Sequence, residues 1–206
     1  MSRYTGPKAR VSRRLGVNLW GTMGENRAME RRPYPPGEHG RTRRRGQPSE
    51  YLAQLQEKQK ARFSYGLTEK QFRNLFAEAS RRKGVTGEIM LQLLELRLDN
   101  VVYRAGWAST RPQARQFVSH GHVHVNGKRV DVPSYRVRKG DKISLSTKSR
   151  EMVVIVWNSD VLDRQPPPWL DKVADDPFAV TVYDVPMREH IDVPVREQLI
   201  VELYSK

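Results

Sequence analysis

Residues 97–142 read RLDNVVYRAGWASTRPQARQFVSHGHVHVNGKRVDVPSYRVRKGDK, and this stretch decides the fold. It begins within a helical pattern, because apolar residues recur at helical spacing from Leu91 to Ala105 and form one stripe. Arg97 and Arg104 are seven residues apart, which places them on one helix face beside that stripe. Gly106 predicts the end of this first helix.

A second helix is predicted from a cap at Ser109 or Thr110 to Gly121. Arg111 and Arg115 are four residues apart on this helix, so both are expected to point outward together. Since the apolar residues of the helix face inward, the sequence predicts a pair of arginines on the outer surface.

A β-hairpin is predicted directly after the second helix. Apolar and polar residues alternate on both sides of Asn126-Gly127, a dipeptide typical of a tight hairpin turn. The apolar members of the alternation are Val123, Val125, Val130 and Val132. Two short helices and an antiparallel hairpin are therefore expected to enclose one small α+β core.

Positive charge surrounds this predicted core. A solvated protein surface usually mixes the two signs of charge, whereas only Asp99, Asp131 and Asp141 oppose the cations here. This pattern favours contact with a nucleic acid over a merely solvated surface. The cations are Arg104, Arg111, Arg115, Lys128, Arg129, Arg136, Arg138, Lys139 and Lys142.

The order of these elements, with TRxxARQFVSHGHVHVNGKRV at their centre, resembles the small RNA-binding module named after small-subunit ribosomal protein S-four. The same module occurs in pseudouridine synthases, tyrosyl-tRNA synthetases and a heat-shock RNA-binding protein. The resemblance of the module therefore implies binding of structured RNA and leaves the kind of protein to be decided by the flanking sequence.

Composition narrows the function classes. The chain has 206 residues, a formal net charge of +14 and no cysteine. A strongly basic chain favours a polyanionic partner, and the absence of cysteine excludes disulfides and thiolate metal sites. The longest apolar run, Met152 to Trp157, is too short to cross a bilayer, and no apolar segment follows the basic N-terminus. We expect a cytoplasmic protein.

The charge is unevenly placed along the chain. Net charge is +8 over residues 1–50, +3 over 51–95, +7 over 96–145 and −4 over 146–206. An anionic membrane surface is the competing partner, but it would favour one basic amphipathic helix, and the sequence shows none. The acidic C-terminal part is expected to face protein, because it repels RNA.

Residues 1–48 are rich in Arg, Gly and Pro and lack apolar periodicity, which predicts a basic irregular extension that orders on a partner. Cations alternate there with Tyr4, Trp20, Tyr34 and His39, a pattern that suits phosphate contact and base stacking. A solvated tail is the alternative, and RRR at 43–45 also fits a nuclear-import patch.

Helices are predicted on either side of Gly66. Ser49 is the expected cap of the first, and Thr68 with Gln71 predicts a capping box for the second. Residues 179–183 alternate and predict a strand, whereas the β-branched run at 152–157 leaves strand and helix open. A final short helix is predicted over residues 195–204.

Motifs along nearly the whole chain resemble the bacterial small-subunit ribosomal protein S-four family. They are RYTGPKARVSRR, PPGEHGRTRRR, YLAQLQEKQKARFSYGLTEKQFRNLFAEA, GEIMLQLLELRLDNVVYRAG and EQLIVELYSK. The resemblance implies a basic extension over 1–48, a helical domain from 49–95 and 184–206, and an RNA-binding module domain inserted between them at 96–183. It also implies a helix at 149–163.

Members of that family bind the 5′ domain of small-subunit (16S) rRNA early in assembly. They neighbour ribosomal protein S-five near the channel through which mRNA enters, and they influence decoding accuracy. Some also repress translation of their own messenger, so mRNA is a further implied partner. Many members carry zinc-binding cysteines between the positions of Leu15 and Gly40; this chain has none, so no metal, cofactor or small-molecule substrate is expected.

The predicted rRNA contacts are cations with interleaved aromatic, His and Asn side chains, and most are expected to meet phosphate and sugar. In the module, Arg111, Arg115, His120 and Lys128 are expected to clamp the RNA backbone. The full predicted set is Arg3, Tyr4, Lys8, Arg10, Arg13, Arg14, His39, Arg43, Arg44, Arg45, Tyr51, Lys58, Arg62, Arg73, Arg111, Arg115, His120, Asn126 and Lys128.

Three other hypotheses are weaker. Arg97-Leu98-Asp99 matches the RLD signature of pseudouridine synthases, but Asp99 lies on a helix with a core stripe and is expected to pair with a nearby arginine. Alternating histidines at 120, 122 and 124 suggest a metal site but lack a nearby acidic ligand. A stress-response RNA chaperone would not need the helices before Arg97.

Overall fold

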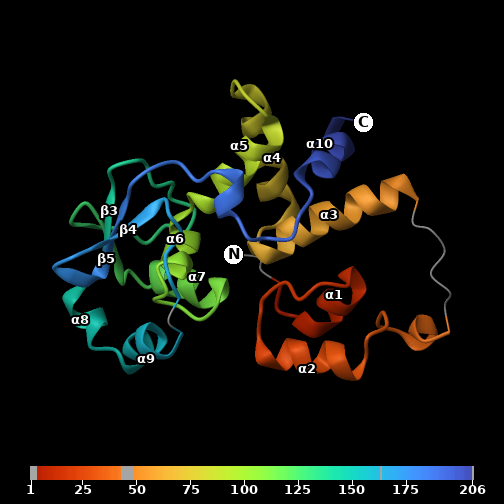
Figure 1. Cartoon of the computed structure of the whole chain (residues 1–206), viewed down its shortest axis with the longest axis horizontal. Helices are drawn as coiled ribbons and strands as arrows, with labels where there is room; N and C mark the ends of the chain where they lie inside the picture. The colour runs from red at the N-terminus through yellow and green to blue at the C-terminus, as the bar shows by residue number, and fades with distance from the viewer. Residues whose placement is uncertain (1–3, 43–48, 163, 206) are drawn as a thin grey trace. The chain divides into compact units, whose positions relative to one another are not determined.

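The computed structural model describes residues 4–42, 49–162 and 164–205. The chain divides into two compact units, which we call the N-terminal unit (Met1–Ser80 with Val193–Lys206) and the central unit (Arg81–Asp192). Figure 1 shows the helices of the N-terminal unit and the mixed helices and strands of the central unit, an α+β architecture as predicted. The predicted domain boundaries at residues 48, 95 and 183 stay a prediction.

The described part of the N-terminal unit is helical. Ser49 caps α3 by accepting a hydrogen bond from the Leu52 N–H, as predicted. The predicted capping box is also present, because Thr68 and Gln71 exchange hydrogen bonds of 3.1 and 3.4 Å. The elements are α1 (Lys8–Leu15), α2 (Met23–Arg31), the 3-10 helix η1 (Glu38–Gly40), α3 (Glu50–Ser64), α4 (Glu69–Arg81) and α10 (Glu197–Ser205).

The C-terminal helix α10 lies against α3. Gln54 on α3 donates to Glu202 at 3.0 Å, and Glu57 accepts from the Arg196 N–H at 2.9 Å just before α10. The ring of Tyr204 stacks on Phe76 of α4 with 4.4 Å between centroids. Residues 128 to 148 positions apart therefore complete one helical layer. The helix predicted over 195–204 is confirmed.

The prediction of an irregular N-terminal extension is wrong for residues 8–31. Helices α1 and α2 form there, and Val11 and Leu19 are buried with Phe63 in one small core. Buried Glu25 accepts hydrogen bonds from the Ser12 hydroxyl and the Leu19 N–H, which joins α2 to α1. The apolar side chains are too sparse to show a local periodicity, and Phe63 of α3 supplies the missing surface.

The central unit contains a five-stranded antiparallel sheet in the order β2-β1-β3-β5-β4 among its described residues. The predicted hairpin is confirmed, although its return strand ends at Arg129 and Val132 is half exposed. The elements are α5 (Thr86–Glu95), α6 (Leu98–Arg104), α7 (Arg111–Ser119), β1 (Val123–Val125), β2 (Lys128–Arg129), β3 (Lys142–Leu145), α8 (Thr147–Arg150), α9 (Val153–Leu162), β4 (Leu170–Val173), β5 (Asp176–Val182) and η2 (Arg188–His190).

The structure assigns one segment of the central unit that the sequence left open and tests a predicted strand. The β-branched run at 152–157 is helical, in agreement with the family resemblance, because Ile155 and Asn158 of α9 are buried and Asn158 donates to the Trp107 carbonyl at 3.0 Å. The strand predicted at 179–183 is confirmed as part of β5, which begins earlier, at Asp176, and ends at Val182. Strands β3, β5 and β4 extend the predicted hairpin into the larger sheet.

The single helix expected up to Ala105 is interrupted, and this is a correction. The chain leaves α5 at Leu96, and α6 begins at Leu98. Between them the backbone pairs with an extended segment, since Leu96 accepts from the Val137 N–H at 3.0 Å and Leu98 donates to the Tyr135 carbonyl at 2.8 Å. These distant backbone partners replace the helical hydrogen bonds at the break.

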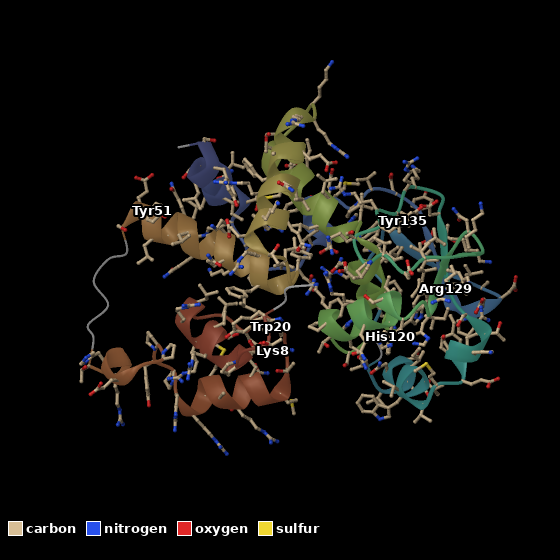
Figure 2. The ribbon with its side chains drawn as sticks, turned by 180° about the vertical axis from the view of Figure 1, so that it is seen from behind. Lys8, Trp20, Tyr51, His120, Arg129 and Tyr135 are labelled. Carbon is tan, nitrogen blue, oxygen red and sulfur yellow. The ribbon has the colours of Figure 1, made fainter. Side chains whose placement is uncertain are left out.

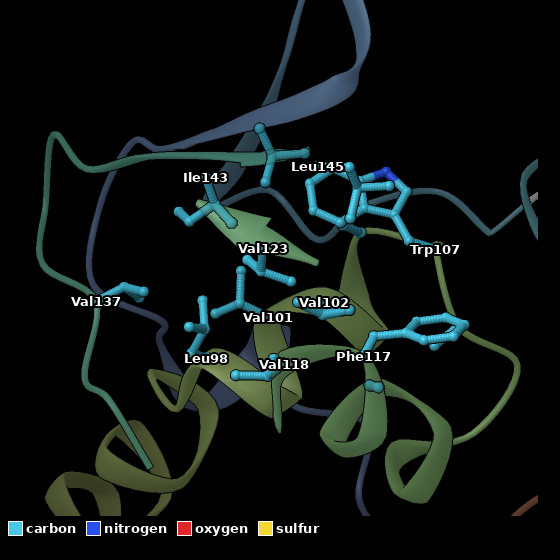
Figure 3. Packing of buried hydrophobic residues seen from close by; sticks show 14 of the residues in the cluster. Leu98, Val101, Val102, Trp107, Phe117, Val118, Val123, Val137, Ile143 and Leu145 are labelled. Carbon is cyan, nitrogen blue, oxygen red and sulfur yellow. The ribbon is translucent and has the colours of Figure 1, made fainter. Parts of the chain in front are cut away.

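Helices α6 and α7 pack on the sheet around one apolar core. Leu98, Val101 and Val102 from α6 and Val118 from α7 are completely buried, and Figure 3 shows them converging on strands of the sheet. Strand side chains complete this core, namely Val123, Val125, Ile143, Leu145, Val180 and Val182. The core fixes the positions from which the polar side chains of α6 and α7 extend.

Gly106, between α6 and α7, is expected to tolerate a side chain poorly. Its φ is +86°, and an added Cβ would meet the Arg164 carbonyl oxygen at 3.3 Å. Gly140 has nearly the same φ, +88°, and open space around it. We expect Gly140→Ala to cost about 1 kcal/mol of unfolding free energy and Gly106→Ala about 2 kcal/mol, measured by urea unfolding. Equal losses of unfolding free energy in the two variants would contradict a role for the close approach of Gly106 to the Arg164 carbonyl oxygen.

Candidate nucleic-acid interface

Arg111 begins α7 and is held by α6. Its Nε donates to the Oδ1 of Asn100 at 2.8 Å, and its Cζ lies 4.4 Å from the centroid of the Tyr103 ring. Thr110 caps α7 by accepting from the Gln113 N–H, which settles the choice between Ser109 and Thr110. Arg111 is thus a partly buried cation in a fixed place, and Asn100 and Tyr103 are the supporting residues that the sequence did not indicate.

Arg115, one turn further on α7, meets the carboxylate of Asp99. The Arg115 Nη1 lies 3.2 Å from Asp99 Oδ2, and Arg97 donates twice to the same carboxylate at 3.1 and 2.8 Å. Asp99 is buried between these two arginines. The expected pairing of Asp99 with a nearby arginine is confirmed.

Arg104 does not belong to the outer basic surface, which corrects the prediction. It is buried, and its Nε and Nη2 each donate to the fully buried Glu95 at 2.9 Å. Asp192 accepts from Nη2 at 2.6 Å. Burial alone lowers the pKa of Arg104, but Glu95 and Asp192 outweigh that effect and raise the pKa above its ordinary value. Arg97 is buried likewise.

The hairpin end of the central unit presents polar and basic groups. His120 ends α7 and is exposed, as is Lys128, and Figure 2 labels His120 and Arg129 in this region. Asn126 has φ +50° and binds Asp141 and the Lys142 N–H, both at 2.8 Å, so its side chain holds the turn.

The alternating histidines have different surroundings. The Nδ1 of His122 lies 2.8 Å from the Ser149 hydroxyl. Burial lowers the pKa of His122, and the charges of His120 and Arg129 lower it further. Within the described ranges, no three His, Cys, Asp or Glu residues gather as a metal site would require.

In the N-terminal unit, several predicted contacts stack on aromatic rings. Lys8 lies over Trp20 at 5.8 Å, and Figure 2 shows these two side chains together. Arg13 lies 5.1 Å from the Tyr34 ring centroid and donates to the Arg32 and Tyr34 carbonyls. Arg13 therefore has a structural role that the sequence did not reveal.

Most other predicted contacts of this unit are exposed. They are Tyr4, Arg10, Arg14, His39, Tyr51 and Arg73. Lys58 differs, because its ammonium lies 2.7 Å from Glu69 and its side chain is only 11% exposed. Arg62 is partly buried and lies 4.2 Å from the ring centroid of Phe63. The predictions at Arg3 and at 43–45 lie outside the described residues.

These side chains can bind a polyanion. Two arginines on α7 are oriented by α6, and partly buried cations lie over aromatic rings on α1 and α3. Such groups suit phosphate contact and base stacking. No helix within the described ranges is long and apolar enough to span a bilayer.

Fold and site together define a protein that has an RNA-binding module and a basic helical unit, and comparison with known proteins agrees. Residues 3–95 match the model of the "Ribosomal protein S4/S9 N-terminal domain", and residues 96–143 match the "S4 domain". The chain belongs to the ribosomal protein S4 family.

Relatives similar over their full length carry one name. The chain is 57% identical to "Small ribosomal subunit protein uS4" of Nocardioides sp. and 57% identical to the protein of that name in Nocardia farcinica. It is 56% identical to the one in Corynebacterium glutamicum strain R. Each comparison covers 100% of both chains.

Proposed function

We propose that the chain is a structural protein of the small ribosomal subunit and binds its rRNA. The full-length similarity to proteins named "Small ribosomal subunit protein uS4" is the observation that carries this proposal. The net charge of +14 and the arginines oriented on α7 give a physical basis for binding RNA. The role is one of binding and architecture and requires no catalytic group.

The finer proposal follows the family resemblance. The chain would bind the 5′ domain of 16S rRNA early in assembly, neighbour ribosomal protein S-five where mRNA enters, and influence decoding accuracy. Repression of its own messenger is a further proposal. The exposed side chains of α1 and the hairpin supply phosphate contacts, and the shape of the RNA supplies most of the specificity.

The test compares two RNAs of equal length, a transcript of the small-subunit 5′ domain and an unrelated structured RNA. Filter binding at low and near-physiological salt measures both affinities. Sequence-independent phosphate contacts weaken steeply as salt rises, so a preference that survives the higher salt indicates specific binding. We expect such a preference. Equal affinities that fall together with salt would identify a general polycation and contradict the proposal.

Arg111 and Arg115 are expected to contribute directly to that affinity. Replacing both by alanine should weaken binding to the 5′-domain transcript about tenfold and lower the slope of log affinity against log salt by about two. The protein should stay folded, because Asp99 keeps its two hydrogen bonds from Arg97 and Asn100 keeps its bond to Glu95.

A matched control removes the same charge elsewhere in the central unit. Lys148 and Lys172 are exposed and lie outside the predicted contacts. Their double alanine variant should bind within about twofold of the unchanged protein. If the Arg111/Arg115 variant also stays within that range, the assignment of α7 as an RNA-binding helix is wrong.

A further inference from the structure

Arg164, on the connection from α9 to β4, lies against the same aromatic ring as Arg111. The Cζ of Arg164 is 4.0 Å from the centroid of Tyr103, and the Cζ of Arg111 is 4.4 Å from it. The three residues come from three separate segments, and the sequence gives no local sign that Arg164 joins the arginines of α7. The result is two guanidinium groups stacked on one ring.

The position of Arg164 is fixed by the backbone around Gly106. Its Nη1 donates to the Tyr103 carbonyl at 3.0 Å and to the Ala108 carbonyl at 3.3 Å. Its Nε and Nη2 donate to none of the residues that the structure describes. The N–H groups on these two nitrogens can therefore donate to a ligand. A guanidinium held in this way loses little conformational freedom when it binds.

A third arginine, Arg104, acts electrostatically on Arg164. Arg104 is itself paired with two carboxylates, Glu95 and Asp192. Burial lowers the pKa of Arg164, and the positive charges of Arg111 and Arg104 lower it further. Tyr103 and Asp192 act to raise it but do not outweigh these effects. An added anion would relieve the mutual repulsion of these arginines.

We propose that Arg164 and Arg111, held on the ring of Tyr103, form one preformed phosphate-binding site for an RNA backbone. The proposal rests on the proposed function and adds a contact and a positioning residue to it. Planar guanidinium groups bind phosphate oxygens through two parallel hydrogen bonds, which an aromatic support orients. Tyr103 is the positioning residue, and Asn100, anchored on buried Glu95, orients Arg111 from the other side.

The first test uses the full chain and the 5′-domain transcript. Arg164→Ala should weaken binding at least about fivefold and lower the salt slope by about one, whereas Lys148→Ala, which also removes one positive charge of the central unit, should change affinity less than about twofold. Tyr103→Leu should weaken binding without changing the slope, because no cation is lost, and Tyr103→Phe should restore the affinity. If Arg164→Ala binds no more weakly than Lys148→Ala, the site is overturned.

A second measurement needs no substitution that could disturb the fold. The Nε–Hε signals of arginines are followed by NMR in the unchanged chain during titration with the same transcript. The signals of Arg164 and Arg111 should shift together, and an unshifted Arg164 signal would overturn the proposal. Failure of the unchanged chain to prefer the 5′-domain transcript would instead count against the proposed function, so the two failures are distinguishable.

Discussion

Replacing Glu95 by alanine is expected to lower the free energy of unfolding of the central unit by about 3–5 kcal/mol. Glu95 is fully buried and accepts two hydrogen bonds of 2.9 Å from Arg104 and one of 2.7 Å from Asn100. The substitution leaves the Arg104 guanidinium buried, and among the described residues its remaining carboxylate partner is the exposed Asp192. Urea unfolding of the full chain, followed by circular dichroism, measures the loss.

A second variant separates two contributions to the free energy of unfolding. One is the cost of leaving a buried charge without its partner, and the other is the net contribution of the Glu95–Arg104 ion pair. Replacing Glu95 and Arg104 together by leucine and methionine removes both buried charges, so the double variant should lose less stability than Glu95→Ala alone. Asp184→Ala is the surface control, because its ion pair with Lys139 is largely exposed and should contribute little. A Glu95→Ala chain that unfolds at the same urea concentration as the unchanged chain would contradict the expectation.

The elements that sequence predicted well are those that local interactions decide. The caps at Ser49 and Thr68 need only side chains within three residues, and the tight turn at Asn126 needs only its own backbone preference. The break after α5 was missed because its backbone partners lie at 135–137, some forty residues downstream. The apolar stripe from Leu91 to Ala105 continues through the break and so hides it.

The helices at the N-terminus were missed for a related reason. Val11 and Leu19 form a stable core only with Phe63, which lies on another helix. Composition correctly indicated too little apolar surface for this segment to fold alone, but it could not show that α3 completes the core. The arginines that suggested an extended, RNA-bound chain are distributed along helices in the structure.

The candidate site was predicted in part. Spacing placed Arg111 and Arg115 on one helix, but it could not show that Asn100 and Asp99 orient them. The inference that Arg104 is exposed failed because a charge pattern does not distinguish a surface cation from one paired with a buried carboxylate. Such pairing depends on tertiary contacts, which the periodicity of the local sequence does not predict.

Removal of residues 1–45 is expected to weaken binding to the 5′-domain transcript about a hundredfold or more at near-physiological salt. The deleted segment carries twelve Lys and Arg and only three Asp and Glu. Phosphate contacts made by these cations release counterions, so the salt slope should fall as well. Helices α3, α4 and α10 should persist, because Phe72, Ala79 and Ile200 are fully buried within them and do not belong to the small core of α1.

Two further variants separate charge from packing in this segment. Arg10 and Arg14 are exposed and four residues apart on α1, so their double glutamine variant should keep the helix and still lose about tenfold in affinity. Val11→Ala, which weakens the core with Phe63 but keeps every charge, should lose less. A truncated chain that binds as tightly as the full chain would rule out a contribution from the segment. The helical circular-dichroism signal of the truncated chain should fall only by the share that α1 and α2 contribute. A larger fall would show that the remaining helices depend on the small core, because loss of the contacts to Phe63 would then have unfolded more than the deleted helices.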